Sequence, residues 1–175
     1  RTVTGVQTCA LPIFVGGEYL SGNDKTDTTI AYNNVNHAFN PFYGTNHKFN
    51  GYMDYFYVGN HANSVGLINP YFKFKYAAEK YWVQLDYHYF MTAAPVLDVV
   101  KTAQTGQITA MSSALGSEVD LTFAYNITKQ AAVQFGYSQI LGPTDTMKAL
   151  RGGNVNATSN WAYLMFVFKP TLFKQ

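Results

Sequence analysis

Residues Tyr81 to Phe90 read Y-W-V-Q-L-D-Y-H-Y-F, and this stretch decides the fold class. Apolar residues occupy every second position from Tyr81, while Gln84, Asp86 and His88 lie between them. Successive side chains of a β-strand point to opposite faces, so a strand here has one apolar and one polar face. A helix would distribute the same polar residues around its axis. The stretch therefore predicts a half-polar β-strand.

The same period of two recurs along most of the chain. Val119 and Leu121, for example, alternate with Glu118 and Asp120. Strands are expected at seven places: 14–20, 49–58, 70–77, 81–90, 117–126, 130–141 and 160–169. The sequence therefore predicts an all-β, antiparallel fold.

The expected connections alternate in length. Residues 77–80 and 126–129 form short turns, whereas 91–116 and 142–159 are long and rich in Gly, Ser, Thr, Asn and Pro. Short turns at one end and long loops at the other are typical of outer-membrane barrels. With a strand at 49–58, the long segment 21–48 would lie at the short-turn end, as a plug, a disordered loop or a further strand.

The amino-acid composition supports strands that have one apolar and one polar face. Of 175 residues, 13% are charged and 17% are aromatic, and the mean hydropathy is -0.11. A soluble domain usually has about 25% charged residues. A charge-rich disordered chain is excluded, and so is a helical membrane protein, because no run of about 18 apolar residues exists.

The first thirteen residues are expected to be foreign to the protein. Val3 to Ile13 match the in-frame translation of a common sequencing-library adapter. A natural strand or a clipped signal peptide is the alternative. We therefore divide the chain into 1–13, an adapter artefact, and 14–175, the C-terminal part of a barrel. Without Arg1, Lys plus Arg falls from 12 to 11 against 10 acidic residues, and Cys9, the only cysteine, is also lost. Nucleic-acid binding and thiol chemistry gain no support.

The apolar faces favour a membrane over a packed soluble core. A soluble ligand-binding β-barrel or sandwich would point mainly aliphatic residues inward, whereas these faces lean towards Tyr and Phe. Bacterial barrels have an even number of strands, at least eight, so we expect an incomplete transmembrane β-barrel with about seven strands. It would lie in the outer membrane of a Gram-negative bacterium. The expected lipid-facing residues are Val83, Leu85, Tyr87, Leu121, Phe123 and Phe135.

The opposite faces carry the candidate lumen residues. These are Lys73, Lys75, Asp54, Asp86, His88, Glu118 and Asp120, together with Arg151. Lys73 and Lys75 share one face, where they would form a short cationic ladder that attracts carboxylates or sugars. Alternatively, they form ion pairs with Asp86 or Asp54 on neighbouring strands.

The sequence supports catalytic roles for these residues less well than it supports a place in the lumen lining. Glu118 and Asp120 lie about 7 Å apart on one strand face, a spacing that any polar-faced strand gives and that acid–base work on sugars could use. An outer-membrane hydrolase would need a clustered nucleophile and base, for example Ser138 near His88. The histidines show no metal-ligand spacing. We predict no catalytic residue, metal or cofactor.

Four blocks, in order along the chain, carry a family resemblance. They are F-N-P-F-Y-G-T-N-H-K-F-N-G-Y-M-D-Y-F-Y-V at 39–58, L-G-S-E-V-D-L at 115–121, Q-F-G-Y-S at 134–138, and N-W-A-Y-L-M at 160–165 with F-K-P at 168–170. Together they resemble the C-terminal region of the alginate-export family of outer-membrane barrels, over roughly 14–170.

The resemblance implies a many-stranded barrel that exports an anionic polysaccharide, such as alginate, through a basic lumen gated by inward loops. The chain departs from that pattern in charge, because Arg151 is the only arginine after residue 13. The function predicted from the sequence is therefore a passive, porin-like outer-membrane channel rather than an enzyme. Its expected partners are outer-membrane lipid and an anionic polysaccharide, and not nucleic acid.

Overall fold

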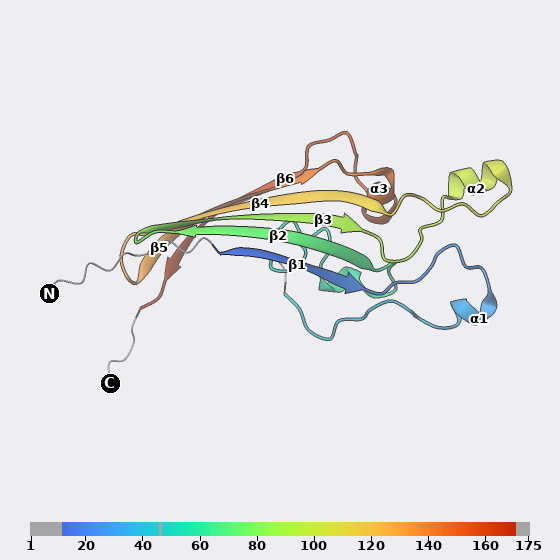
Figure 1. The fold of residues 1–175 in the computed structure, drawn as a ribbon, viewed down its shortest axis with the longest axis horizontal. Helices are drawn as coiled ribbons and strands as arrows, with labels where there is room; N and C mark the ends of the chain where they lie inside the picture. Colours follow the sequence, from blue (N-terminus) through green and yellow to red (C-terminus); the bar gives the residue numbers. More distant parts are fainter. Residues whose placement is uncertain (1–11, 46, 171–175) are drawn as a thin grey trace.

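The computed structural model describes residues 12–45 and 47–170, and its main element is one antiparallel sheet (Figure 1). The six strands are β1 (Ile13–Leu20), β2 (Leu67–Ala77), β3 (Tyr81–Met91), β4 (Ala114–Asn126), β5 (Ala131–Leu141) and β6 (Asn160–Phe168). The short helices α1 (Ile30–Asn33), η1 (Val58–Asn60), α2 (Val99–Thr105) and α3 (Asp145–Arg151) lie in the connections. The all-β, antiparallel prediction is confirmed.

Each strand pairs with its neighbours in the chain, in the order β1-β2-β3-β4-β5-β6. Strands β1 and β6 therefore each have one paired edge in the described part of the chain, and the sheet is open. The period of two matches the pairing. Leu85 lies opposite Leu121, and Phe123 lies opposite Phe135, so apolar residues of neighbouring strands share a face.

The strand predicted at 49–58 is wrong. This stretch consists of turns that lead into η1. Asn50, Gly51 and Asp54 have φ angles of 54°, 85° and 56°, which belong to the left-handed region and are incompatible with a strand. The described residues therefore contain six strands rather than seven.

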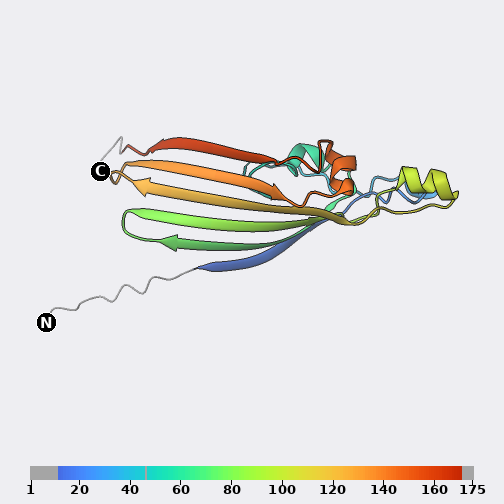
Figure 2. The ribbon, with the colours of Figure 1, turned by 90° about the horizontal axis from the view of Figure 1, so that it is seen from above.

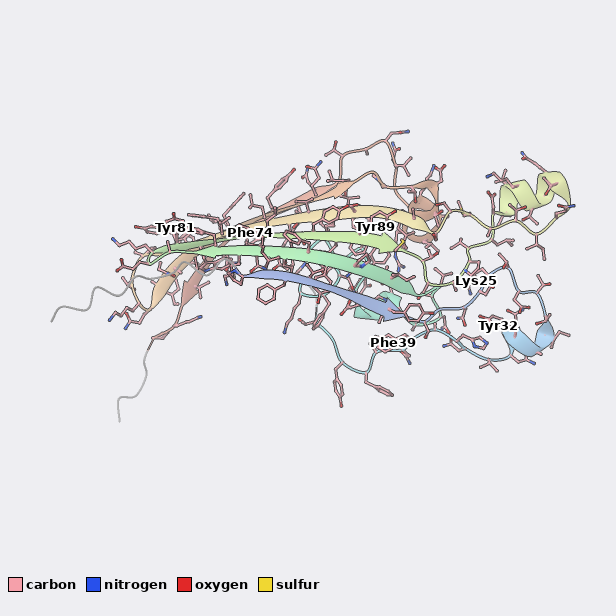
Figure 3. The ribbon with its side chains drawn as sticks, viewed as in Figure 1. Lys25, Tyr32, Phe39, Phe74, Tyr81 and Tyr89 are labelled. Carbon is pink, nitrogen blue, oxygen red and sulfur yellow. The ribbon has the colours of Figure 1, made fainter. Side chains whose placement is uncertain are left out.

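Removing that strand changes where the long segment lies. Residues 21–66 now connect β1 directly to β2, at the same end of the sheet as 92–113 and 142–159. The short turns 78–80 and 127–130 lie at the other end (Figure 2). Lys25, Tyr32 and Phe39 accordingly lie towards the long-connection end, far from Tyr81 at the short-turn end (Figure 3). The expectation that 21–48 lies at the short-turn end is also wrong.

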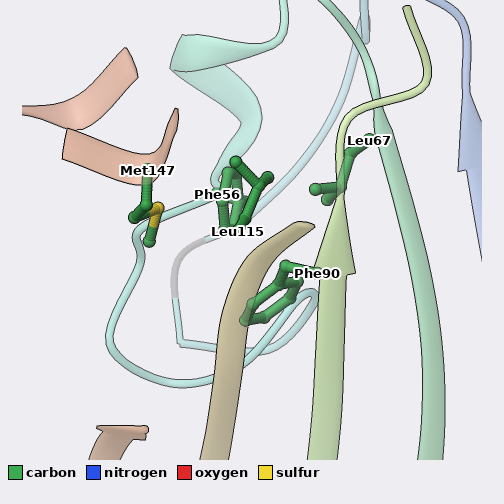
Figure 4. Packing of buried hydrophobic residues seen from close by; sticks show 5 residues of the cluster. All are labelled: Phe56, Leu67, Phe90, Leu115 and Met147. Carbon is green, nitrogen blue, oxygen red and sulfur yellow. The ribbon is translucent and has the colours of Figure 1, made fainter. Parts of the chain in front are cut away.

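A small hydrophobic core lies at the long-connection end (Figure 4). Its buried members are Phe56, Leu67, Phe90, Leu115 and Met147. Three come from the strand ends of β2, β3 and β4, one from α3, and Phe56 from the 21–66 connection. Burying these side chains gives roughly 1.5–3 kcal/mol each, so the core fixes the connection and α3 onto the sheet.

Candidate functional site

Strand register gives the sheet two faces of opposite chemistry. Lys73 lies opposite Asp86, and Asp86 lies opposite Asp120, so all three lie on one face. This polar face holds every Asp, Glu, Lys and Arg of β1–β6: Glu18, Lys73, Lys75, Asp86, Glu118 and Asp120. The other face, here the apolar face, has no charged residue on the six described strands.

The six residues predicted to face lipid all lie on the apolar face. They are Val83, Leu85, Tyr87, Leu121, Phe123 and Phe135. Leu85 is 39% exposed, Phe123 is 41% and Phe135 is 42%. Strand β6 extends the same surface with Leu164, Phe166 and Phe168, which are more exposed still.

The polar face is instead covered by residues 47–61, which we call the covering segment. The N–H of Met53 donates to Glu118 Oε1 at 2.8 Å, and Asn69 Nδ2 donates to Asn50 Oδ1 at 2.8 Å. The ring of His47 stacks on Trp161 with centroids 4.8 Å apart. Asp86, Glu118 and Asp120 are buried on this face, while large apolar side chains of the other face stay exposed. This arrangement is the inverse of that in a soluble domain.

Two lysines on the polar face have different partners. Lys73 Nζ lies 2.8 Å from Asp86 Oδ2, and Gln84 Nε2 also donates to this carboxylate. Lys75 Nζ lies 4.4 Å from the centre of the Trp82 ring, and no ion pair of Lys75 occurs within 12–45 and 47–170. Lys73 thus follows the ion-pair alternative, whereas Lys75 stays an unneutralised cation.

The structure does not bring Ser138 and His88 together as a hydroxyl–imidazole pair. His88 Nδ1 bonds Asn69 Oδ1 at 3.1 Å, and His88 lies opposite Glu118. Ser138 lies opposite Asp120 on the far side of β4, and its Oγ is buried without a partner. Glu118 itself is fully buried, so it has no access to a sugar.

Asp54 and Arg151 belong to connections rather than to strands. The sequence placed Asp54 on a strand, but it lies on the covering segment, where its Oδ2 is 3.0 Å from His47 Nδ1. Arg151 ends α3, with its Cζ 5.2 Å from the centre of the Phe56 ring. Burial lowers the pKa of His61, and the charge of Arg151 acts in the same direction.

Sequence reasoning missed the contribution of the covering segment to the site. Burial raises the pKa of Tyr52 to about 12, and the charges of Asp86 and Asp120 act in the same direction, so this phenol stays neutral. Gly51 lies directly on the polar face, where a Cβ would come 2.4 Å from the Glu118 carboxyl carbon. The Asn50-Gly51 dipeptide was an available signal, because Asn-Gly marks turns.

Comparison with protein-family models, with curated proteins and with solved structures gives no match to this chain. The resemblance to the alginate-export family therefore stays a prediction. No helix within 12–45 and 47–170 is long and apolar enough to cross a membrane. Across the same residues, no three acidic, histidine or cysteine side chains converge on a possible metal site.

Proposed function

We propose that this chain forms part of an outer-membrane β-barrel in which the polar face lines a channel and the covering segment narrows it. The observation that carries the proposal is the inverted polarity of the sheet. All charged strand residues lie on the covered face, while the opposite face exposes Leu, Phe and Tyr. In water such an apolar surface would promote aggregation, whereas in lipid it is the stable arrangement.

The lengths of the strands and the positions of the aromatic residues support the proposal that the strands span a membrane. Strands β2, β3 and β5 have 11 residues each and β4 has 13, against about 9–11 for a tilted strand that spans a bilayer. Tyr81 pairs with Tyr125 beside the short turns, and Tyr87 and Tyr89 lie towards the other end of β3. Two aromatic belts in these positions suit the two membrane–water interfaces.

The proposal requires more strands than the described residues contain. Barrels of this class have at least eight strands, and six are present here. Additional strands would pair with the free edges of β1 and β6, and a longer chain would supply them. Reading the coding DNA upstream of Phe14 tests this part, because it should continue in frame through further half-polar strands.

Export of an anionic polysaccharide such as alginate is the specific form of the proposal. Two cations support it, because neither Lys75 nor Arg151 has an acidic partner within the described residues. Block of channel current by an anionic oligosaccharide, compared with a neutral one of equal length, tests this substrate. Lys75→Gln should weaken the block by the anionic compound alone.

Lipid contact can be tested residue by residue along β4. In a Cys9→Ser background, single cysteines at positions 119–125 would carry spin labels in lipid vesicles. We expect odd positions, such as Leu121, to be accessible to dissolved oxygen and even positions, such as Thr122, to be shielded from it. Accessibility of the odd positions to a water-soluble nickel chelate, rather than to oxygen, would contradict the proposal.

A further inference from the structure

Two carboxyl groups on β4 are buried with too few hydrogen-bond donors. Glu118 is 0% exposed and Asp120 is 1% exposed. Glu118 Oε1 accepts the N–H of Met53. The Ser138 hydroxyl and the Tyr52 N–H lie close to the pair, but neither forms a hydrogen bond of good geometry with Glu118 Oε2 or with the carboxyl oxygens of Asp120. An unpaired buried carboxylate costs several kcal/mol. The pair therefore needs a ligand that supplies positive charge or a donor.

None of the neighbouring groups supplies that charge. The titratable or charged groups that face the pair are Lys73 on β2, Asp86 and His88 on β3, Tyr52 on the covering segment and Tyr163 on β6; β5 contributes the hydroxyl of Ser138. Lys73 is already bound to Asp86 at 2.8 Å. Tyr52 is held neutral by its burial, and His88 is engaged with Asn69. Asp86 adds a further negative charge.

The space around the pair suits a proton better than a metal ion. Residues i and i+2 of a strand share a face, and the two carboxyl groups lie within hydrogen-bonding reach of each other. The backbone of Gly51 packs so closely that a Cβ there would overlap the Glu118 carboxyl group. A cation that binds oxygen would need about six ligands, and no third Asp, Glu, His or Cys side chain joins the pair in the described chain.

We propose that Glu118 and Asp120 hold one proton between them while the covering segment is docked on the polar face. The protonated carboxyl group donates its O–H to the other carboxylate, which satisfies two of the unpaired oxygens. Loss of this proton to water leaves two adjacent buried carboxylates, and their repulsion and desolvation release the segment. The acid pair thus acts as a pH-sensitive latch, closed when protonated and open when ionised.

The latch can be tested by following the docking of the covering segment as the pH changes. The chain would be refolded in detergent micelles, and hydrogen-exchange protection of the peptide 47–61 would be measured from about pH 5 to about pH 9, between the ordinary carboxyl and tyrosine pKa values. After correction for the intrinsic exchange rate, we expect protection to fall by up to about tenfold per pH unit, the limit for one proton, as the pH rises above the ordinary carboxyl pKa that the pair has when the segment is released. The fall should level off once the docked pair itself has ionised. Protection that does not change with pH would overturn the proposal.

Amide variants separate the latch from other titrations. In Glu118→Gln the amide N–H can donate to Asp120 at any pH, so protection should not fall as the pH rises from about 6.5 to about 9. Asp120→Asn tests the same point if the first variant folds poorly. Glu18→Gln, which removes a carboxylate of the same face on β1, should keep the wild-type profile. If both amide variants of the pair keep it too, the proposal is wrong.

Two further measurements identify the occupant of the pair. Infrared difference spectra between Glu118→Gln and the wild type at neutral pH should contain the carbonyl stretch of a protonated acid, and its absence would overturn the proposal. A chelator should leave protection of 47–61 unchanged at constant pH. If a chelator releases the covering segment and calcium restores its protection, the pair binds a metal ion and the proposal is wrong. Because these readouts report docking and not conductance, the latch and the channel proposal can fail separately.

Discussion

The two faces of the sheet are built from the same strands, but the apolar face is exposed and much of the polar face is buried. On β4, Leu121 is 37% exposed, whereas its neighbours Asp120 and Thr122 are 1% and 3% exposed. Water alone would favour the reverse, because burying an ionised carboxylate is costly and burying leucine is favourable. Two questions follow from this difference. One is what surrounds the exposed apolar face, and the other is what holds the covering segment on the polar face.

The cover is fixed by two kinds of contact. At the long-connection end, Phe56 is buried in an apolar core with Phe90 and Leu115. Next to this core, the backbone N–H of Met53 and the side-chain amide of Asn50 contact Glu118 and Asn69. The apolar face has no comparable partner within the described residues, and in the proposed function lipid would cover it.

Removing the Phe56 side chain, which joins the covering segment to the hydrophobic core, should have the largest effect on the difference between the two faces. Phe56→Ala deletes a side chain that is 2% exposed and should cost about 3–5 kcal/mol, because the cavity cannot be refilled. Hydrogen exchange over 47–61 should lose its protection and expose the polar face. Phe42→Ala, on the same connection but 93% exposed, serves as the control and should change stability by less than about 0.5 kcal/mol. Equal effects of the two variants would mean that the core does not hold the cover.

A charge on the apolar face should come next. If the proposed barrel forms, Leu121→Arg should cost about 2–4 kcal/mol in lipid vesicles, because an arginine that faces lipid near mid-membrane loses its hydration. Ile127→Arg, in a short turn and 59% exposed, should cost at most about 1 kcal/mol. The free energy of unfolding in urea measures both. A cost below about 0.5 kcal/mol for Leu121→Arg would instead fit a face in contact with water.

The sequence predicted the two faces better than their cover. Alternation around Leu85, Leu121 and Phe135 depends on the strand period alone, so it could be recognised without any tertiary information. The same pattern misled at 52–57, where Y-M-D-Y-F-Y imitates a strand although Asn50 and Gly51 turn the chain. The Glu118–Asp120 pair could be placed on one face, but its burial depends on a distant segment that no local pattern reveals.

Close contact between the cover and the acid pair should give an intermediate effect. Gly51→Ala adds a methyl group at a φ of 85°, where it would come 2.4–2.6 Å from the Glu118 carboxyl group. We expect a loss of about 1–3 kcal/mol in docking, which combines backbone strain with overlap. Gly106→Ala is the matched control, because its φ is 69° and nothing lies within 4 Å of the added carbon. Exchange protection of 47–61 should fall in the first variant only, and a fall in both would assign the effect to strain elsewhere.

Acid should weaken the cover through His61, and this is the smallest effect we expect. His61 is 5% exposed, and its lowered pKa means that the docked segment holds this ring neutral. The released segment binds a proton at His61 below about pH 6.5, so the contribution of neutral His61 to docking is fully present above that pH and is lost as the pH falls towards the lowered pKa. His61→Gln should flatten the acid side of the exchange profile, and Arg151→Gln should reduce its slope by removing the neighbouring charge. The alkaline side, which the acid pair governs, should not change in either variant. If the exchange profile of His61→Gln is unchanged at acid pH, a group other than His61 causes the acid weakening.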